Sequence, residues 1–135
     1  MQISNFNDLL MAARLQPLPQ RLLFVFATVE LPDNPTPEQR ADFEAGHGGA
    51  IVPLMCVDKG PDELDAFSTL VIEAEQFGKP WAMVFVAALS GSVGQPPDAE
   101  AVKKALDKMI EAVKQGDIES FIPFNIQGEP LQMGA

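Results

Sequence analysis

The sequence predicts an α/β fold, a three-layer domain with a mostly parallel sheet, four helices and a C-terminal β-hairpin. Three nearly uninterrupted apolar runs cover residues 22–29, 50–57 and 81–89. Runs this rich in Val, Ile, Leu, Phe and Met are typical of strands buried on both faces, as in parallel sheets covered by helices. The segments between the runs have helical periodicity, so helices and strands alternate along the chain.

The first helix is predicted from its cap and its apolar spacing. Asn5 or Ser4 can cap a helix whose apolar residues recur at helical intervals up to Ala13, and Pro17 ends it. The strand at residues 22–29 follows directly.

The second helix has a well-formed start, with Thr36 as N-cap, Pro37 at the first helical position and Gln39 able to close a capping box. The next strand, residues 50–57, contains Pro53, which cannot donate a hydrogen bond to a neighbouring strand. We therefore expect this strand to lie at a sheet edge or to carry a bulge.

The third helix is predicted to begin at Pro61, with an apolar stripe from Leu64 to Phe77 and a stop at Gly78. The strand at residues 81–89 has no proline and is apolar on both faces. These properties favour a position at the centre of the sheet.

The fourth helix is predicted to begin at Asp98 and to end at Gly116. The remaining residues, 120–133, alternate loosely around Gly128 and suggest a closing hairpin, with Pro123 keeping its first strand away from the centre.

Composition indicates one globular domain over residues 1–135. The chain is 47% hydrophobic, and its apolar runs are too short to cross a bilayer, which takes about 20 residues. The start of the sequence lacks the features of a secretory signal, so we expect a soluble cytoplasmic protein without membrane contact. Cys56 is the only cysteine, which excludes an intramolecular disulfide and a zinc site built from thiolates.

The net charge of −10 is unevenly spread, with eleven acids between Glu30 and Glu75 against only Arg40 and Lys59. Nucleic acid is excluded as a partner because its backbone is bound by clustered basic residues, which this chain lacks. The acidic stretch is either a surface for a basic partner or a solvated face that maintains solubility.

Ligands of a doubly wound sheet bind beyond the carboxyl ends of its strands, where three loops qualify: residues 30–35, 58–62 and 90–98. In the last loop, amides and hydroxyls can surround an anion at a helix N-terminus. The candidate ligand-binding residues are Ser90, Gly91, Ser92, Gly94, Glu30 and Asp58. The alternative for this loop is ordinary turn chemistry, because no phosphate-binding motif is present and Asp98 would compete with an anion.

We predict no catalytic residue, no metal site and no cofactor. His47, the single histidine, precedes a strand rather than following one, and the serine hydrolase elbow motif is absent. The acids Asp58, Asp62, Glu63 and Asp65 do not have the spacing of an EF-hand.

Three segments, residues 20–27, 49–59 and 81–91, resemble a small proteobacterial protein family whose members are sometimes labelled ribonucleotide reductase subunit alpha. The resemblance spans nearly the whole chain and implies a bacterial cytoplasmic protein, but no functional residues. Ribonucleotide reduction needs a radical-bearing cysteine and a redox-active cysteine pair, which Cys56 alone cannot supply.

These observations favour a non-enzymatic protein-interaction module, such as an adaptor, a chaperone-like protein or an assembly factor. We expect a homo-oligomer that binds an unidentified protein partner through an acidic or apolar surface. The alternative is a small-molecule or anion-binding protein, or an enzyme, with its site at the Ser90–Asp98 loop.

Overall fold

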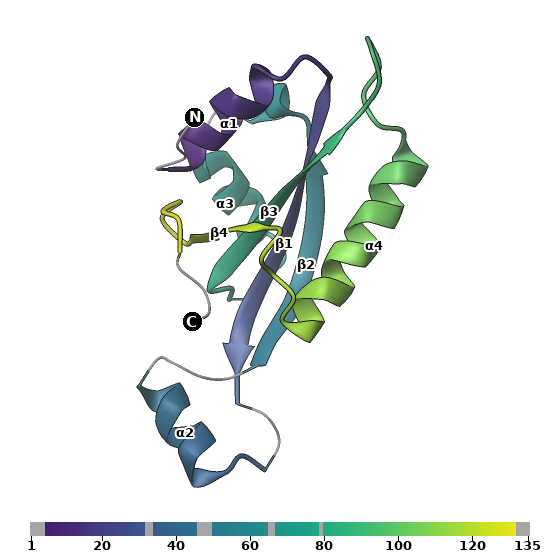
Figure 1. Cartoon of the computed structure of the whole chain (residues 1–135). Coiled ribbons are helices and arrows are strands. Elements are labelled where there is room, and N and C mark those ends of the chain that lie inside the picture. Colours follow the sequence, from purple (N-terminus) through teal and green to yellow (C-terminus); the bar gives the residue numbers. More distant parts are fainter. Residues whose placement is uncertain (1–4, 32–33, 46–49, 65–66, 79, 132–135) are drawn as a thin grey trace.

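The computed structural model of the protein describes residues 5–31, 34–45, 50–64, 67–78 and 80–131, with the side chain of residue 43 left aside. Figure 1 shows the order of the elements along the chain. They are α1 (Phe6–Arg14), β1 (Gln20–Glu30), α2 (Pro37–Glu44), β2 (Ala50–Lys59), the 3₁₀ helix η1 (Pro61–Glu63), α3 (Phe67–Glu75), β3 (Met83–Ser90), α4 (Ala99–Gln115) and β4 (Ile122–Asn125).

The sheet is antiparallel, so the prediction of a mostly parallel sheet is wrong. Its four strands follow the order β2-β1-β3-β4, and each strand pairs antiparallel with its neighbours. The helical connection from β2 to β3 does join two strands of the same direction, as the alternating pattern predicts. However, β1 lies between these two strands and runs against both.

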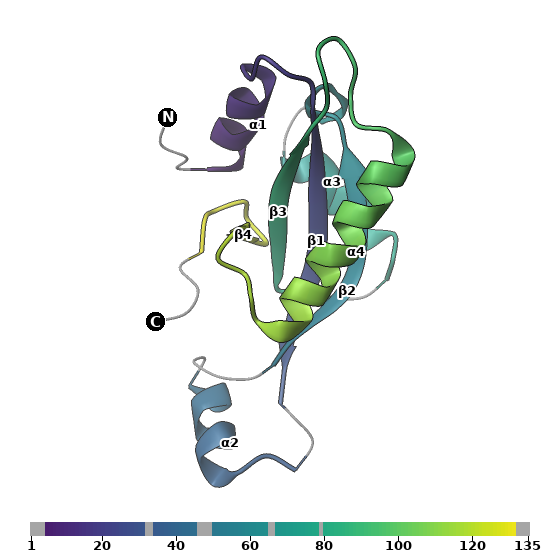
Figure 2. The ribbon, with the colours of Figure 1, turned by 45° about the vertical axis from the view of Figure 1, so that its right-hand side comes forward.

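Burial on both faces, which suggested a parallel sheet, arises here from helices on both sides of an antiparallel one. Alternate side chains of β1 enter two separate clusters: Leu22, Phe24 and Phe26 pack with α1 and α3, while Leu23, Val25 and Ala27 pack with α4. Figures 1 and 2 show these helices on opposite faces of the sheet. The prediction of three layers is therefore confirmed.

Aromatic rings fill the layer beneath α1 and α3. The ring of Phe6 lies 5.0 Å from that of Phe67 and 5.4 Å from that of Phe124, both edge to face. Trp81 packs on Phe26 with ring centroids 4.9 Å apart. Such contacts add to the burial energy of each ring, and they tie β4 and both helices to the central strand.

The predicted caps are confirmed where the structure describes them. Asn5 accepts a hydrogen bond from the amide of Asp8 at 2.9 Å, and Thr36 and Gln39 form the reciprocal capping box of α2. Asp98 caps α4 by accepting from the amide of Ala101 at 2.8 Å, and Gly116 ends it in the left-handed conformation.

The third helix differs from the prediction, because the stretch beginning at Pro61 is split. It forms the single turn η1, the backbone is extended at Leu64, and the described part of the next helix is α3, Phe67–Glu75. Leu64 is fully buried in the core cluster with extended backbone, so its side chain reaches the core from between the two helices.

α2 stands apart from the sheet, beyond the ends of β1 and β2 (Figures 1 and 2). Every described side chain of this helix is exposed. α2 is thus an excursion between two adjacent antiparallel strands and covers neither face. His47 and Asp65 lie outside the described residues.

The edge positions of β2 and β4 agree with their prolines. β2 is an edge strand with a register shift opposite Phe26 and Ala27, as Pro53 predicts, and β4, which contains Pro123, forms the other edge. The predicted hairpin is short: after β4 the chain turns at Gly128 and returns through a single bridge between Phe124 and Pro130.

Candidate functional site

The antiparallel arrangement brings two of the three predicted loops together and separates the third. β2 and β3 both end beside the start of β1, where Lys59 pairs with Leu22 and Ser90 pairs with Gln20. Asp58 and the loop that begins at Ser90 therefore occupy the same end of the sheet. Glu30 lies at the opposite end, about 24 Å along β1 from the partner of Asp58, because residues of a strand rise about 3.4 Å each.

The loop after β3 uses most of its own hydrogen-bonding groups. Ser90 Oγ accepts from the Gln20 side chain at 2.9 Å, and the amide of Gly91 donates to the carbonyl of Pro19 at 2.8 Å. Ser92 and Gln95 exchange two backbone hydrogen bonds around a turn that contains Gly94. With Asp98 already capping α4, an anion at this helix N-terminus would meet a carboxylate.

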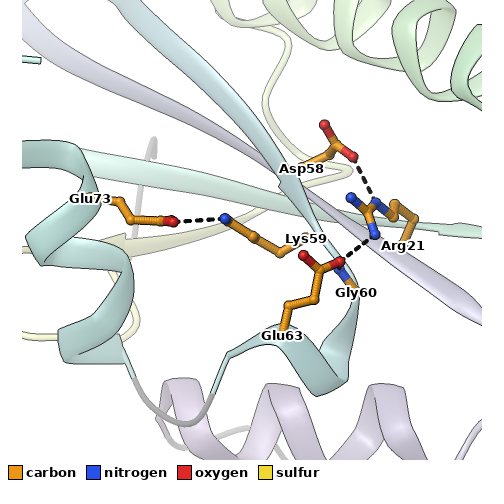
Figure 3. A network of polar contacts seen from close by, with 6 residues as sticks. All are labelled: Arg21, Asp58, Lys59, Gly60, Glu63 and Glu73. Atoms are coloured by element: carbon orange, nitrogen blue, oxygen red, sulfur yellow. Dashed lines mark hydrogen bonds and ion pairs between the residues drawn. The ribbon is translucent and has the colours of Figure 1, made fainter. Parts of the chain in front are cut away.

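Asp58 belongs to an ion-pair network centred on Arg21 (Figure 3). The Arg21 guanidinium donates to Asp58 Oδ2 at 2.6 Å and to Glu63 Oε1 at 2.5 Å. Glu63 Oε1 also accepts from the amide of Gly60 at 2.9 Å. This backbone hydrogen bond, with Arg21 as a further cause, holds the pKa of Glu63 below its ordinary value. The network fixes η1 against the end of β2.

Lys59 connects the same end of β2 to the opposite face of the sheet. Its ammonium lies 2.7 Å from Glu73 Oε1 on α3, as Figure 3 shows. Asp58 and Lys59 are neighbours in sequence, and their side chains point to opposite faces because strand side chains alternate.

A pocket of about 450 Å³ lies between this end of β2, the loop after β3 and the first half of α4. Its volume is within the range of small-molecule sites. Its walls are formed by Arg21, Cys56, Asp58, Pro96, Pro97, Ala99, Val102, Lys103, Leu106 and Asp107.

Cys56 is the only thiol among the residues that line this pocket, and no serine or threonine hydroxyl lines it. Burial raises the pKa of its thiol, and the negative charges of Asp107 and Asp58 raise it further. Since the thiolate is the reactive form, a raised pKa disfavours nucleophilic chemistry. Among the residues that the structure describes, no group of three potential metal-binding side chains is assembled.

The outer edge of β2 carries backbone groups that lack a partner within the described residues. In an antiparallel ladder, alternate residues direct their N–H and C=O groups to opposite neighbours. On β1, the carbonyls of Pro19 and Ala27 accept from Gly91 and Ala82 on the β3 side. The even-numbered residues of β1 therefore face β2.

The register then decides which residues of β2 point outward. The residues of β2 that pair with odd-numbered residues of β1 direct their backbone groups away from the sheet. These residues are Ile51, Pro53, Cys56 and Asp58. Proline is tolerated at this edge because its missing N–H faces outward. In the described part of the chain no backbone or side-chain group bonds to this edge. We call it the β2 edge.

Sequence reasoning found Asp58 and the edge character of β2 but missed Arg21, Lys103 and Asp107. Pro53 was the signal for the edge. Arg21 precedes an apolar run, where a basic residue has many ordinary explanations, and only the register places it beside Asp58. Lys103 and Asp107 are four residues apart on one helix face, a pattern that also occurs on solvated helices.

A scan of family models and searches of curated proteins and of solved structures found no match to this chain. In the described residues, no helix is both long and apolar enough to cross a membrane.

Proposed function

We propose that the protein is a non-enzymatic protein-interaction module, an adaptor, chaperone-like protein or assembly factor, that associates by adding a strand at the β2 edge. The observation that carries this proposal is a ten-residue strand whose outward backbone groups have no partner among the described residues. Exposed strand edges bind extended segments through main-chain hydrogen bonds, while side-chain pockets supply specificity.

The side chains near the bulge support the same proposal. Val52, Pro53 and Leu54 are half-buried, and they pack into neither core cluster. Proline and a bulge at a strand edge limit uncontrolled pairing. The stretch from Leu54 to Lys59 has no proline, so pairing is confined to this half of the β2 edge.

The exposed acids of α2, namely Glu38, Asp42 and Glu44, add an acidic surface beyond the other end of β2. Such a surface favours a partner that carries basic residues. We also propose a bacterial cytoplasmic location, which rests on the family resemblance.

An affinity capture with matched variants tests the proposal. Leu54→Lys places a charge on the β2 edge without emptying the core, whereas Val93→Lys makes the same change on a loop residue that is 88% exposed. Tagged wild-type protein and both variants are incubated with lysate from cells that express the protein natively. We expect proteins that wild type and Val93→Lys retain and that Leu54→Lys loses. Identical sets from all three, or no retained protein, would contradict the proposal.

Small-molecule binding, or enzyme activity, at the loop is the second candidate, and the pocket of about 450 Å³ favours it. Ala99 lies on the pocket wall and is exposed, so Ala99→Phe would fill the pocket from its rim. Thermal-shift screening of metabolites should find a ligand that stabilises wild type but not Ala99→Phe. A screen without such a ligand would remove this candidate.

A further inference from the structure

We infer that the strand added at the β2 edge is β2 of a second copy of this chain, paired antiparallel about a two-fold axis. This inference rests on the proposed function and names the occupant of its surface. The result is a dimer in which two four-stranded sheets become one continuous sheet, the closed symmetric arrangement most common among homodimers.

The backbone of the β2 edge is self-complementary on its proline-free half. Cys56 and Asp58 both direct N–H and C=O groups outward, and they are two residues apart. With the axis at Val57, Cys56 of each copy lies opposite the partner's Asp58. Each such pair exchanges two hydrogen bonds, so all outward groups of these residues are satisfied.

The charges on β2 also favour the antiparallel arrangement. With the axis at Val57, Lys59 lies opposite Met55, and no like charges stand directly opposite each other. A parallel pairing in register would place Asp58 beside Asp58 and Lys59 beside Lys59, which is unfavourable.

The helices fit this arrangement as well. α4 packs over both β1 and β2, and a two-fold axis perpendicular to the sheet places both copies of α4 on the same face. Their axes would then be separated by about two strand spacings, roughly 9.6 Å. Packed helices lie about 8–10 Å apart, so the two copies of α4 would be in contact.

The helix surface that would meet the partner carries opposite charges four residues apart. Lys103 and Asp107 line the same pocket as Cys56 and Asp58, which places them near the proposed axis. Both are exposed, and neither forms an ion pair within the described residues. In an antiparallel helix pair, Lys103 of each copy approaches the partner's Asp107, which gives two symmetric ion pairs.

A charge swap tests this contact, with the dissociation constant of the dimer measured by sedimentation equilibrium. Lys103→Glu and Asp107→Lys should each weaken the dimer at least about tenfold, because both symmetric pairs change from attraction to repulsion. The double variant should return to within about threefold of wild type, because it restores opposite charges. Lys108→Glu, the same charge change at an exposed position of α4, should have little effect.

The dissociation constant of the Leu54→Lys variant is measured in the same way and tests whether the dimer forms through the β2 edge. Circular dichroism confirms that each variant is folded. A wild-type dimer that both Leu54→Lys and the single charge reversals dissociate supports the inference. A wild-type protein that stays monomeric at every soluble concentration overturns it but leaves the β2 edge free for a foreign strand. A dimer that resists Leu54→Lys associates through another surface, which overturns the inference but leaves the β2 edge free for a foreign strand, so the affinity capture alone decides the proposed function. A double variant as weak as the single variants overturns the two-fold arrangement.

Discussion

Glu63 connects local electrostatics to the pH dependence of stability. The amide of Gly60 and the guanidinium of Arg21 both favour its ionised form, so its pKa in the folded protein is below the ordinary value of 4.5. The resulting stabilisation is present above that ordinary value and is lost as the pH falls through the lower folded value.

The variant Glu63→Gln isolates this contribution. We expect it to be less stable than wild type at neutral pH by about 0.5 kcal/mol, a small value because the half-exposed side chain is screened by water. The difference should vanish in acid, well below pH 4.5, as measured by urea unfolding. A difference that persists unchanged in acid would rule out an electrostatic origin. Glu119→Gln, at an exposed position, is the control.

Gly91 has a structural role that the sequence pattern alone did not reveal. A Cβ atom at this position would come within 2.1 Å of the carbonyl oxygen of Gln95 and 2.8 Å of the backbone of Pro96. The turn after β3 therefore needs glycine here, because two backbone segments approach each other too closely for a side chain.

We expect Gly91→Ala to destabilise the protein by about 2 kcal/mol, as is typical of overpacking. Ser92→Ala, one residue further on an exposed part of the turn, should change stability by less than about 0.5 kcal/mol. Chemical denaturation measures both. Equal stabilities for the two variants would contradict the close approach at Gly91.

Among the elements, α2 is the one that its own sequence must stabilise. A helix of eight residues is marginal in water, since isolated helices need about 12–15 residues. No described side chain of α2 is buried, so its capping box at Thr36 and Gln39 carries much of its stability.

Hydrogen exchange followed by mass spectrometry checks this point. Thr36→Ala should increase exchange in residues 37–44 and leave both α4 and the melting temperature of the whole protein unchanged. Slow exchange in α2 of this variant, comparable to that in α4, would mean that packing rather than capping holds the helix.

The features of the fold that the sequence predicts correctly are those that depend on a few neighbouring residues. Caps are local, so Asn5, Thr36, Asp98 and Gly116 could be assigned from short patterns. Pro53 placed β2 at an edge through the same kind of local chemistry.

Strand direction is not local, and it was predicted wrongly. An apolar run reports that both faces of a strand are covered, but not by which elements. The segment between β1 and β2 contains a helix and is long enough for a crossover, yet α2 covers neither face. The grouping of Glu30 with Asp58 was wrong for the same reason. The carboxyl ends of strands share one side of a sheet only when the strands are parallel, and β1 runs against β2.

In the whole molecule, the strand order places β1 and β3 inside the sheet and β2 at one of its edges. β1 and β3 have neighbours on both sides, and helices cover both faces of the sheet. Within the part of the chain that the structure describes, β2 has a neighbouring strand on one side only. Any association by strand pairing must therefore use β2 or the four-residue β4, and β2 offers the longer edge.

Residue-resolved amide exchange by NMR in dilute solution tests the open edge most directly. We predict that the amides of Ile51, Cys56 and Asp58 exchange quickly, whereas those of Val52, Met55 and Val57, which face β1, are protected. Alternation of this kind arises only where one side of a strand is unpaired. Equal protection of both sets, at a concentration where the protein is monomeric, would show that another part of the chain covers β2 and would contradict an open edge.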